Sequence, residues 1–322
     1  MQNRRSQYIW LWVIILLLIL GVSAYMILFA DRKRDPVRLS VILSDSGNDC
    51  YTAVKQGMDQ AAFDNDMEIT YVNTDRFGSI TDELNILKRE AESGANAIIF
   101  EPVASDGYEE FLSANSGSCP MVLLDSDVIP EDRYSKVDED NKAVGECLYE
   151  AVLSGNGGSL EGLKIGMITA YTGQEAVKER TEALLSHKDL KDAVSCIINI
   201  DGKDEAGLYG TLNSDPVDVI IAMGSYETQK AIDYITDNGL EGTVKLYGAG
   251  YSEKSIHFMD MGVVTFLCLT NEFNKGYLSV EAAYSQLKHG GIVRKTVNEV
   301  FAVNRENMYD EEFQKVLFPV VQ

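Results

Sequence analysis

Short, wholly apolar runs alternate with segments of mixed polarity along nearly the whole chain after residue 38, and this alternation constrains the fold more than any other feature. Ala97-Ile98-Ile99-Phe100 and Val219-Ile220-Ile221-Ala222 are two such runs, with the composition of strands that are covered on both faces. Segments with helical composition, such as 80–92 and 226–238, separate the runs. Strands that alternate with helices in this way predict an α/β fold with parallel sheets.

The alternating elements fall into two series, each long enough for a sheet of its own. Of the 322 residues, roughly 285 follow an N-terminal apolar segment, which is enough for two lobes with separate cores. We therefore expect two doubly wound sheets, with one large α/β domain as the alternative. The expected strands are 39–43, 68–72, 97–100 and 121–124 in the first series, and 164–168, 195–200, 217–222 and 244–247 in the second.

An uncharged segment of 23 residues, from Tyr8 to Ala30, precedes these series. A helix of this length crosses a hydrocarbon core of roughly 30 Å. We therefore predict a transmembrane anchor at residues 8–30, after a tail at 1–7 and before a linker at 31–37. The small residues Val22-Ser23-Ala24 leave cleavage after Ala24 open. Basic residues flank both ends of the segment, so the charge pattern alone does not fix its orientation.

The charge balance and the cysteines argue against several classes of function. The chain has 50 acidic and 28 basic residues and a formal net charge of -22, which disfavours nucleic acid as a partner. The three histidines and five cysteines show no metal-ligand spacing, so we predict no zinc site and no cofactor. We expect buried free thiols and no structural disulfide framework. The cysteines are Cys50, Cys119, Cys147, Cys196 and Cys268.

Ligands of open parallel sheets bind beyond the carboxyl ends of the strands, where loops meet helix N-termini. This rule identifies the segments most suited to a binding site. They are 45–51, 101–106, 125–127, 170–173, 224–227 and 248–252.

Several segments resemble, in order and spacing, the type I periplasmic binding proteins, specifically the ribose- and galactose-binding branch related to the core of LacI-type repressors. The resemblance covers nearly the whole chain after residue 38. It rests on Val41-Ile42-Leu43-Ser44 with 48–52, Gly94-Ala95-Asn96-Ala97-Ile98-Ile99-Phe100-Glu101-Pro102, Val122-Leu123-Leu124-Asp125, Asp138-Glu139-Asp140-Asn141, and 172–180.

The resemblance implies two doubly wound lobes joined by a hinge of three strands, with a ligand cleft between them that closes by hinge bending. It implies lobe 1 at 38–137 plus 251–273 and lobe 2 at 138–250 plus 274–322. The chain then crosses between lobes three times and ends in lobe 2. Asp140 and Asn141 stand at the first crossing, where we interpret them as hinge and helix cap.

Positions that match the family supply the first ligand-binding candidates. Asn48 and Tyr51 follow the first strand, where relatives place an amide and an aromatic ring against a sugar; helix capping is the structural alternative. Asp125 matches an acidic residue that accepts hydrogen bonds from sugar hydroxyls, although Ser126 stands where the ribose-binding pattern has arginine. Arg180 matches a ligand arginine of the family, with a surface salt bridge as its alternative.

The opposite wall of the expected cleft departs from the sugar-binding pattern. Gly224 and Gly250 stand where relatives have an amide and an acid, and Thr270 or Asn271 stands where they have an amide. Polar residues at or near these positions are the remaining candidates, and each has a turn or a helix cap as its alternative role. These candidates are Ser225, Tyr226, Glu227, Tyr251 and Asn271.

Together these features favour a binding protein. The chain has no GxSxG, HExxH, Walker or complete GxGxxG motif, and residues 8–30 occupy the place of a repressor's helix-turn-helix. We predict an extracytoplasmic, single-pass membrane protein that presents a small polar, sugar-like ligand to the permease of an ABC transporter. One alternative is a ligand-sensing partner of a membrane histidine kinase; a less favoured one is an enzyme on the same scaffold.

Overall fold

The computed structural model describes residues 2–30, 36–115, 117–130, 133–201 and 206–318, and the chain forms two compact units, Met1–Val37 and Arg38–Gln322. The first unit contains helix α1 (Gln2–Ala30). Among the described residues, no helix is both long and apolar enough to cross a membrane. The predicted transmembrane anchor at 8–30 is therefore not supported. Most of the predicted linker falls on residues 31–35, which lie outside the described ranges.

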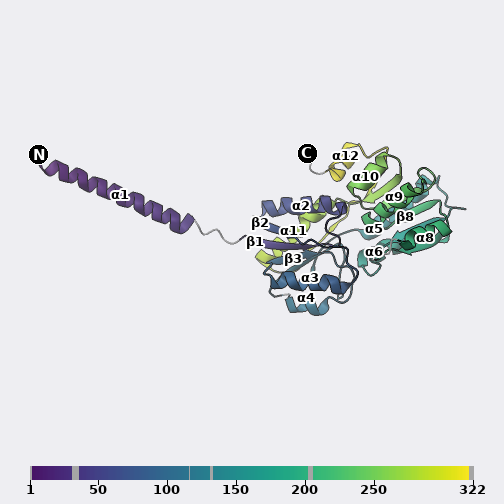
Figure 1. The fold of residues 1–322 in the computed structure, drawn as a ribbon, viewed down its shortest axis with the longest axis horizontal. Coiled ribbons are helices and arrows are strands. Elements are labelled where there is room, and N and C mark those ends of the chain that lie inside the picture. Colours follow the sequence, from purple (N-terminus) through teal and green to yellow (C-terminus); the bar gives the residue numbers. More distant parts are fainter. Residues whose placement is uncertain (1, 31–35, 116, 131–132, 202–205, 319–322) are drawn as a thin grey trace. The chain divides into compact units, whose positions relative to one another are not determined.

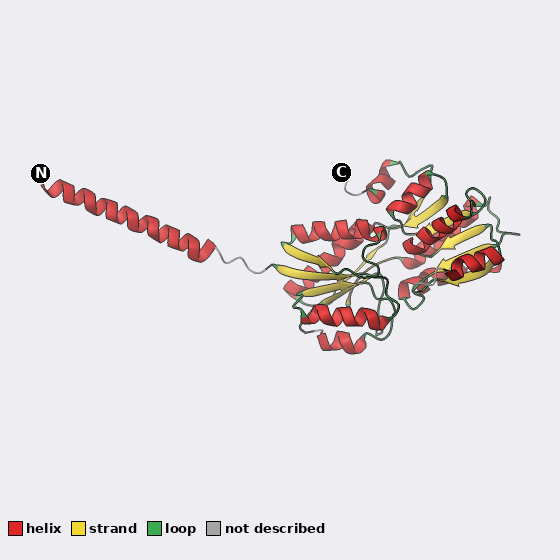
Figure 2. Cartoon of the chain, in the orientation of Figure 1, coloured by secondary structure: helices red, strands yellow, loops and turns green. Residues whose placement is uncertain are grey.

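The second unit contains two six-stranded sheets with helices on their faces (Figures 1 and 2). In the first lobe, the strand order is β11 (Arg294–Val297), β5 (Ser135–Glu139), β4 (Met121–Leu124), β3 (Ala97–Phe100), β1 (Val37–Ile42) and β2 (Met67–Tyr71). The pairs from β11 through β1 are parallel. Helices α2 (Thr52–Asp64) and α11 (Glu272–His289) lie on one side of this sheet, and α3 (Ile80–Glu92) and α4 (Glu109–Asn115) on the other (Figure 1).

The second lobe repeats this arrangement. Its strand order is β12 (Phe301–Val303), β10 (Val264–Leu269), β9 (Lys245–Ala249), β8 (Val219–Ala222), β6 (Ile165–Thr169) and β7 (Val194–Asn199). Only the edge strand β12 pairs antiparallel in the described pairings of this sheet. Its helices are α5 (Asn141–Gly155), α6 (Glu175–Leu185), α7 (Lys188–Ala193), α8 (Ala206–Ser214), α9 (Ser225–Asp237), α10 (Glu253–Asp260) and α12 (Glu311–Leu317).

Alternate residues of the central strands face opposite helix layers, which explains why these runs are wholly apolar. In β8, Val219 and Ile221 pack with residues of α5, α6 and α7, whereas Ile220 and Ala222 pack with residues of α8 and α9. All four side chains are fully buried. Removing each valine or isoleucine from water contributes roughly 1.5–3 kcal/mol. The two-faced burial predicted for these strands is confirmed.

The chain passes between the lobes three times, as expected, but two lobe assignments were at least partly wrong. The crossings join β5 to α5, β10 to α11, and β11 to β12. Residues 251–273 were expected in lobe 1, yet β10 pairs with β9 in the second sheet. Residues 274–322 were expected in lobe 2, yet α11 packs on α2 and β11 pairs with β5 in the first lobe. The error arose because 264–269 was not recognised as one more strand of the second sheet.

Cys147 and Cys268 form a disulfide, which corrects the prediction that all cysteines are free. The bond ties α5 to β10 within the second lobe, and the two Cα atoms lie 6.0 Å apart. The partners are separated by 121 residues, so their proximity depends on the order of strands in the sheet and leaves no trace in local spacing. Cys50, Cys119 and Cys196 are free thiols.

Candidate functional site

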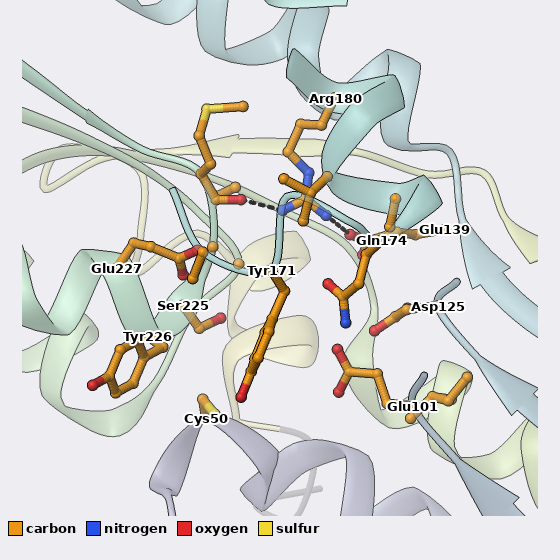
Figure 3. A pocket seen from close by; sticks show the side chains of 18 of the residues that line it. Cys50, Glu101, Asp125, Glu139, Tyr171, Gln174, Arg180, Ser225, Tyr226 and Glu227 are labelled. Atoms are coloured by element: carbon orange, nitrogen blue, oxygen red, sulfur yellow. Dashed lines mark hydrogen bonds and ion pairs between the residues drawn. The ribbon is translucent and has the colours of Figure 1, made fainter. Parts of the chain in front are cut away.

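A cavity lies between the lobes, where the carboxyl ends of strands from both sheets meet. Loops that follow β3, β4, β6, β8 and β9 line it, together with residues of α6, α9 and α11. Glu101, Asp125, Gln174 and Tyr171 project into this space, the last two from the loop between β6 and α6 (Figure 3). The volume is about 130 Å³, below the roughly 300–1,000 Å³ of pockets that hold drug-sized ligands. The cavity therefore fits a small molecule.

Tyr51, one of the predicted ligand-binding residues, lies in the cavity wall and is paired with Glu101. It ends the short helix η1 (Asp49–Tyr51), and its hydroxyl donates to Glu101 Oε2 at 3.0 Å. Burial and the neighbouring Asp125 raise the pKa of Glu101 to about 7, against the opposing effect of Lys275. Glu101 was indicated only as the first residue of the segment 101–106. The structure makes it a central acid of the site.

Asn48 lies outside the cavity lining. Its Oδ1 accepts a hydrogen bond from Cys50 N at 3.0 Å and so caps η1. The same side chain exchanges hydrogen bonds with the amide of Gln229 in α9, at 3.0 and 3.3 Å. The capping alternative is therefore confirmed for Asn48, and the residue also joins the two lobes.

Asp125 lines the cavity, but a cation of the protein already holds its carboxylate. Lys275 Nζ lies 2.8 Å from Asp125 Oδ1, 2.8 Å from Glu272 Oε2 and 3.6 Å from Glu139 Oε2. Burial opposes the charge on the lysine, yet the three carboxylates keep the pKa of Lys275 well above its usual value. Sequence reasoning missed Lys275, because a lysine in a long helix looks like a solvated surface residue until that helix is placed.

Arg180 lines the cavity and is buried, which excludes the surface salt bridge considered for it. Its Nη2 donates to Glu139 Oε1 at 2.7 Å and to Asn141 Oδ1 at 2.5 Å, and its Nη1 donates to the carbonyl oxygen of Met223. Burial would raise the pKa of Glu139, but Lys275 and Arg180 outweigh it and lower that pKa to about 2. Asp140, the residue after Glu139, caps α5 by accepting a hydrogen bond from Ala143 N, as expected.

Three of the five second-lobe candidates line the cavity, and two do not. Ser225, Tyr226 and Glu227 form its wall at the start of α9 (Figure 3). Tyr251 instead packs in the second-lobe core, where its hydroxyl donates to Val316 O at 2.8 Å. Asn271 caps α11 by accepting from Asn274 N at 2.9 Å. Asn271 is therefore a helix cap, as its alternative had it, whereas Tyr251 has a packing role that the sequence did not predict.

Two further residues of the wall face each other across the lobes. Arg76, in the loop between β2 and α3, was not predicted, and Tyr171 fell within the expected segment 170–173. Arg76 Cζ lies 3.7 Å from the ring centroid of Tyr226 and 4.5 Å from that of Tyr171. Arg76 follows an edge strand of the first sheet, and the segments expected from the sequence did not include the loop after that strand.

Comparison with protein families decides what kind of protein carries this site. A family model described as a periplasmic binding protein domain matches residues 39–291. The chain belongs to the periplasmic binding protein family. A search of curated protein sequences found no match to this chain.

Solved structures of periplasmic binding proteins with the type I fold are similar in fold. A carbohydrate transporter solute-binding protein from Agrobacterium radiobacter, in complex with D-arabinose, has a TM-score of 0.77 at 16% identity, over 88% of this chain and 99% of that one. GanP, a glucose-galactose binding protein from Geobacillus stearothermophilus, has a TM-score of 0.73 at 15% identity, over 86% and 100%. A chain of the XylFII-LytSN complex has a TM-score of 0.70 at 17% identity, over 84% and 99%.

Proposed function

We propose that the protein is an extracytoplasmic solute-binding protein whose lobes close around one small polar, sugar-like ligand. The observation that carries this proposal is the cavity itself, where carboxylates, arginines and tyrosines from both lobes line one small space. Ionised groups form stronger hydrogen bonds to hydroxyls than neutral ones, and tyrosine rings offer apolar faces to a sugar ring. Membership of the family supports binding rather than catalysis.

Direct contacts between the lobes support closure as the working motion. The Tyr171 hydroxyl lies 2.6 Å from Ser44 Oγ and donates to Phe77 O at 3.1 Å. Gln174 Nε2 donates to Pro102 O at 2.8 Å. A ligand that binds only the closed form stabilises it by roughly 2.7 kcal/mol at a hundredfold excess over its dissociation constant. That energy is enough to shift a lobe-closure equilibrium.

A thermal-shift screen of sugars, nucleosides and small peptides tests this function. At least one small polyhydroxylated compound should raise the melting temperature. The same compound should not raise the melting temperature of Asp125→Ala above that of the unliganded variant. An unchanged rise would remove Asp125 from the site, and a panel without any stabilising compound would contradict the proposal as a whole.

For the partner, we propose the permease of an ABC importer, with a membrane sensor kinase as the alternative. The fold similarity to a chain of the XylFII-LytSN complex supports keeping the alternative. The two roles differ in what ligand occupancy changes. Liganded protein should stimulate ATP hydrolysis by a cognate importer in proteoliposomes, whereas the alternative requires ligand-dependent binding to a sensor domain.

Attachment to the membrane through residues 8–30 is a proposal that rests on sequence alone. The uncharged run from Tyr8 to Ala30 is its support. The full-length protein should then stay in the membrane fraction after carbonate extraction. Complete release would contradict the anchor.

A further inference from the structure

Arg76 places an unpaired guanidinium in the ligand cavity. Arg76 forms no ion pair within the described part of the chain, and its Nε and Nη2 are buried without a hydrogen-bond partner there. Guanidinium stays protonated in proteins, and a buried donor without an acceptor costs about 1–3 kcal/mol, more when it is charged. These two nitrogens therefore require acceptors that the described residues do not supply.

The aromatic contacts place this group against two rings of the opposite lobe. The guanidinium of Arg76 lies over the rings of Tyr226 and Tyr171, which belong to the opposite lobe. Ring contacts use the face of the guanidinium plane and leave its edge for hydrogen bonds. Nε and Nη2 form one such edge, with two parallel N–H bonds that match the two oxygens of a carboxylate.

The other cations of the cavity are already neutralised. Lys275 is paired with Asp125 and Glu272, and Arg180 with Glu139. Arg180 retains one buried donor without a partner, its Nε, in the same cavity wall. Unsatisfied donors therefore remain on two arginines, and of these two only Arg76 has no ion pair among the described residues.

The acids that remain do not prevent an anion from binding. Burial raises the pKa of Glu227, against the opposing effects of nearby backbone N–H groups, Arg76 and Arg180. Burial and Asp125 raise the pKa of Glu101 to about 7. Both groups therefore carry less negative charge near neutral pH than exposed glutamates.

We propose, on the basis of the solute-binding function above, that the ligand is a small polyhydroxy acid whose carboxylate is held by the Nε–Nη2 edge of Arg76. Glu101 and Asp125 at the other side of the cavity accept from its hydroxyls. Because Tyr171 and Tyr226 hold the guanidinium only when the lobes are together, carboxylate binding and closure support each other.

Titration calorimetry of the full-length protein with matched sugar pairs tests this class. D-glucuronate and D-galacturonate should bind at least about 10-fold more tightly than D-glucose and D-galactose. Arg76→Met should lower uronate affinity roughly 10- to 100-fold, the range for a hydrogen bond to a charged group. Hexose affinity should fall much less, because a hexose has no carboxylate for this edge of Arg76 and loses only the contribution of Arg76 to closure. Arg76→Lys keeps the charge without the paired donors, so its uronate affinity should lie between those of the wild type and Arg76→Met. The exposed Arg89→Met serves as the matched control.

The possible failures are distinguishable. Equal binding of uronates and hexoses, or equal loss of both in Arg76→Met, would show that Arg76 has only a packing role, and would leave the solute-binding function standing. Tighter binding of glucose 6-phosphate than of glucuronate would overturn the carboxylate assignment. Binding of none of these compounds would overturn both the acid and the sugar-like ligand class.

Discussion

A single buried lysine organises the charges of the binding cavity. The side chain of Lys275 is 4% exposed and faces Asp125, Glu139 and Glu272, which are themselves mostly buried. Each carboxylate has lost most of its hydration, which disfavours its ionised form. The ammonium group of Lys275 compensates for this loss by pairing with the carboxylates. Arg180 neutralises the far side of Glu139.

Removing this lysine should be costly. Lys275→Met should lower the free energy of unfolding by about 3–5 kcal/mol near neutral pH, because it leaves buried carboxylates without their counter-ion. The loss should be smaller at low pH, where the acids can be protonated. Urea denaturation measures both values. Lys315→Met, in an exposed pair with Glu311, should change stability by less than about 1 kcal/mol. Equal effects of the two variants would contradict the role of Lys275.

Glu101 gives the site a second pH response. Its pKa rises from 4.5 unfolded to about 7 folded, so its contribution to stability is present below about pH 4.5 and is lost as the pH rises through 7. Glu101→Gln should therefore match the wild type near pH 4 and exceed it at about pH 8, on the order of 1–3 kcal/mol. Denaturation across this range measures the difference. A gain that is independent of pH would rule out titration of Glu101 as its cause.

At the scale of elements, two glycines allow α2 and α11 to pack at close range. A Cβ on Gly57 would lie 1.9 Å from Phe273 O, and a Cβ on Gly276 would lie 2.0 Å from Val54 O. Because these neighbours are backbone atoms, they cannot rotate away. The contact also sets the position of α11, and with it Lys275, relative to the first sheet.

Gly276→Ala should therefore push the helices apart. We expect a loss of about 1–3 kcal/mol in stability from overpacking, together with weaker ligand binding as Lys275 shifts. Gly210→Ala in α8 is the control, because a Cβ there meets nothing within 4 Å and alanine is the better helix former. Thermal unfolding compares the two. If Gly276→Ala proved as stable as Gly210→Ala, the close approach of α2 and α11 would be wrong.

At the scale of the whole molecule, residues outside the cavity join the lobes. Gln229 of α9 exchanges hydrogen bonds with Asn48 and donates to Asp49 of the first lobe. It does not line the cavity. Its effect on ligand binding can therefore come only through closure.

Gln229→Ala should favour the open form. Loss of two or three interlobe hydrogen bonds, each worth roughly 0.5–1.5 kcal/mol, should weaken ligand binding by about 5-fold or more. Small-angle scattering should show a larger radius for the unliganded variant, which saturating ligand reverses. Weaker binding without any change in radius would mean that the lobes do not move.

The sequence by itself determined the α/β class, the two series of strands and the loops that could carry a site. It did so because a strand that is buried on both faces needs consecutive apolar residues, as in Val219-Ile220-Ile221-Ala222, and such a run is visible in the sequence. Of the residues it nominated, Tyr51, Asp125, Arg180, Ser225, Tyr226 and Glu227 do line the cavity. Only the tertiary structure decided the rest. Cys147 meets Cys268, Lys275 reaches Asp125, and Arg76 reaches Tyr226 from positions 121 to 150 residues apart in the chain. Such contacts depend on strand order and lobe pairing, which no local pattern encodes.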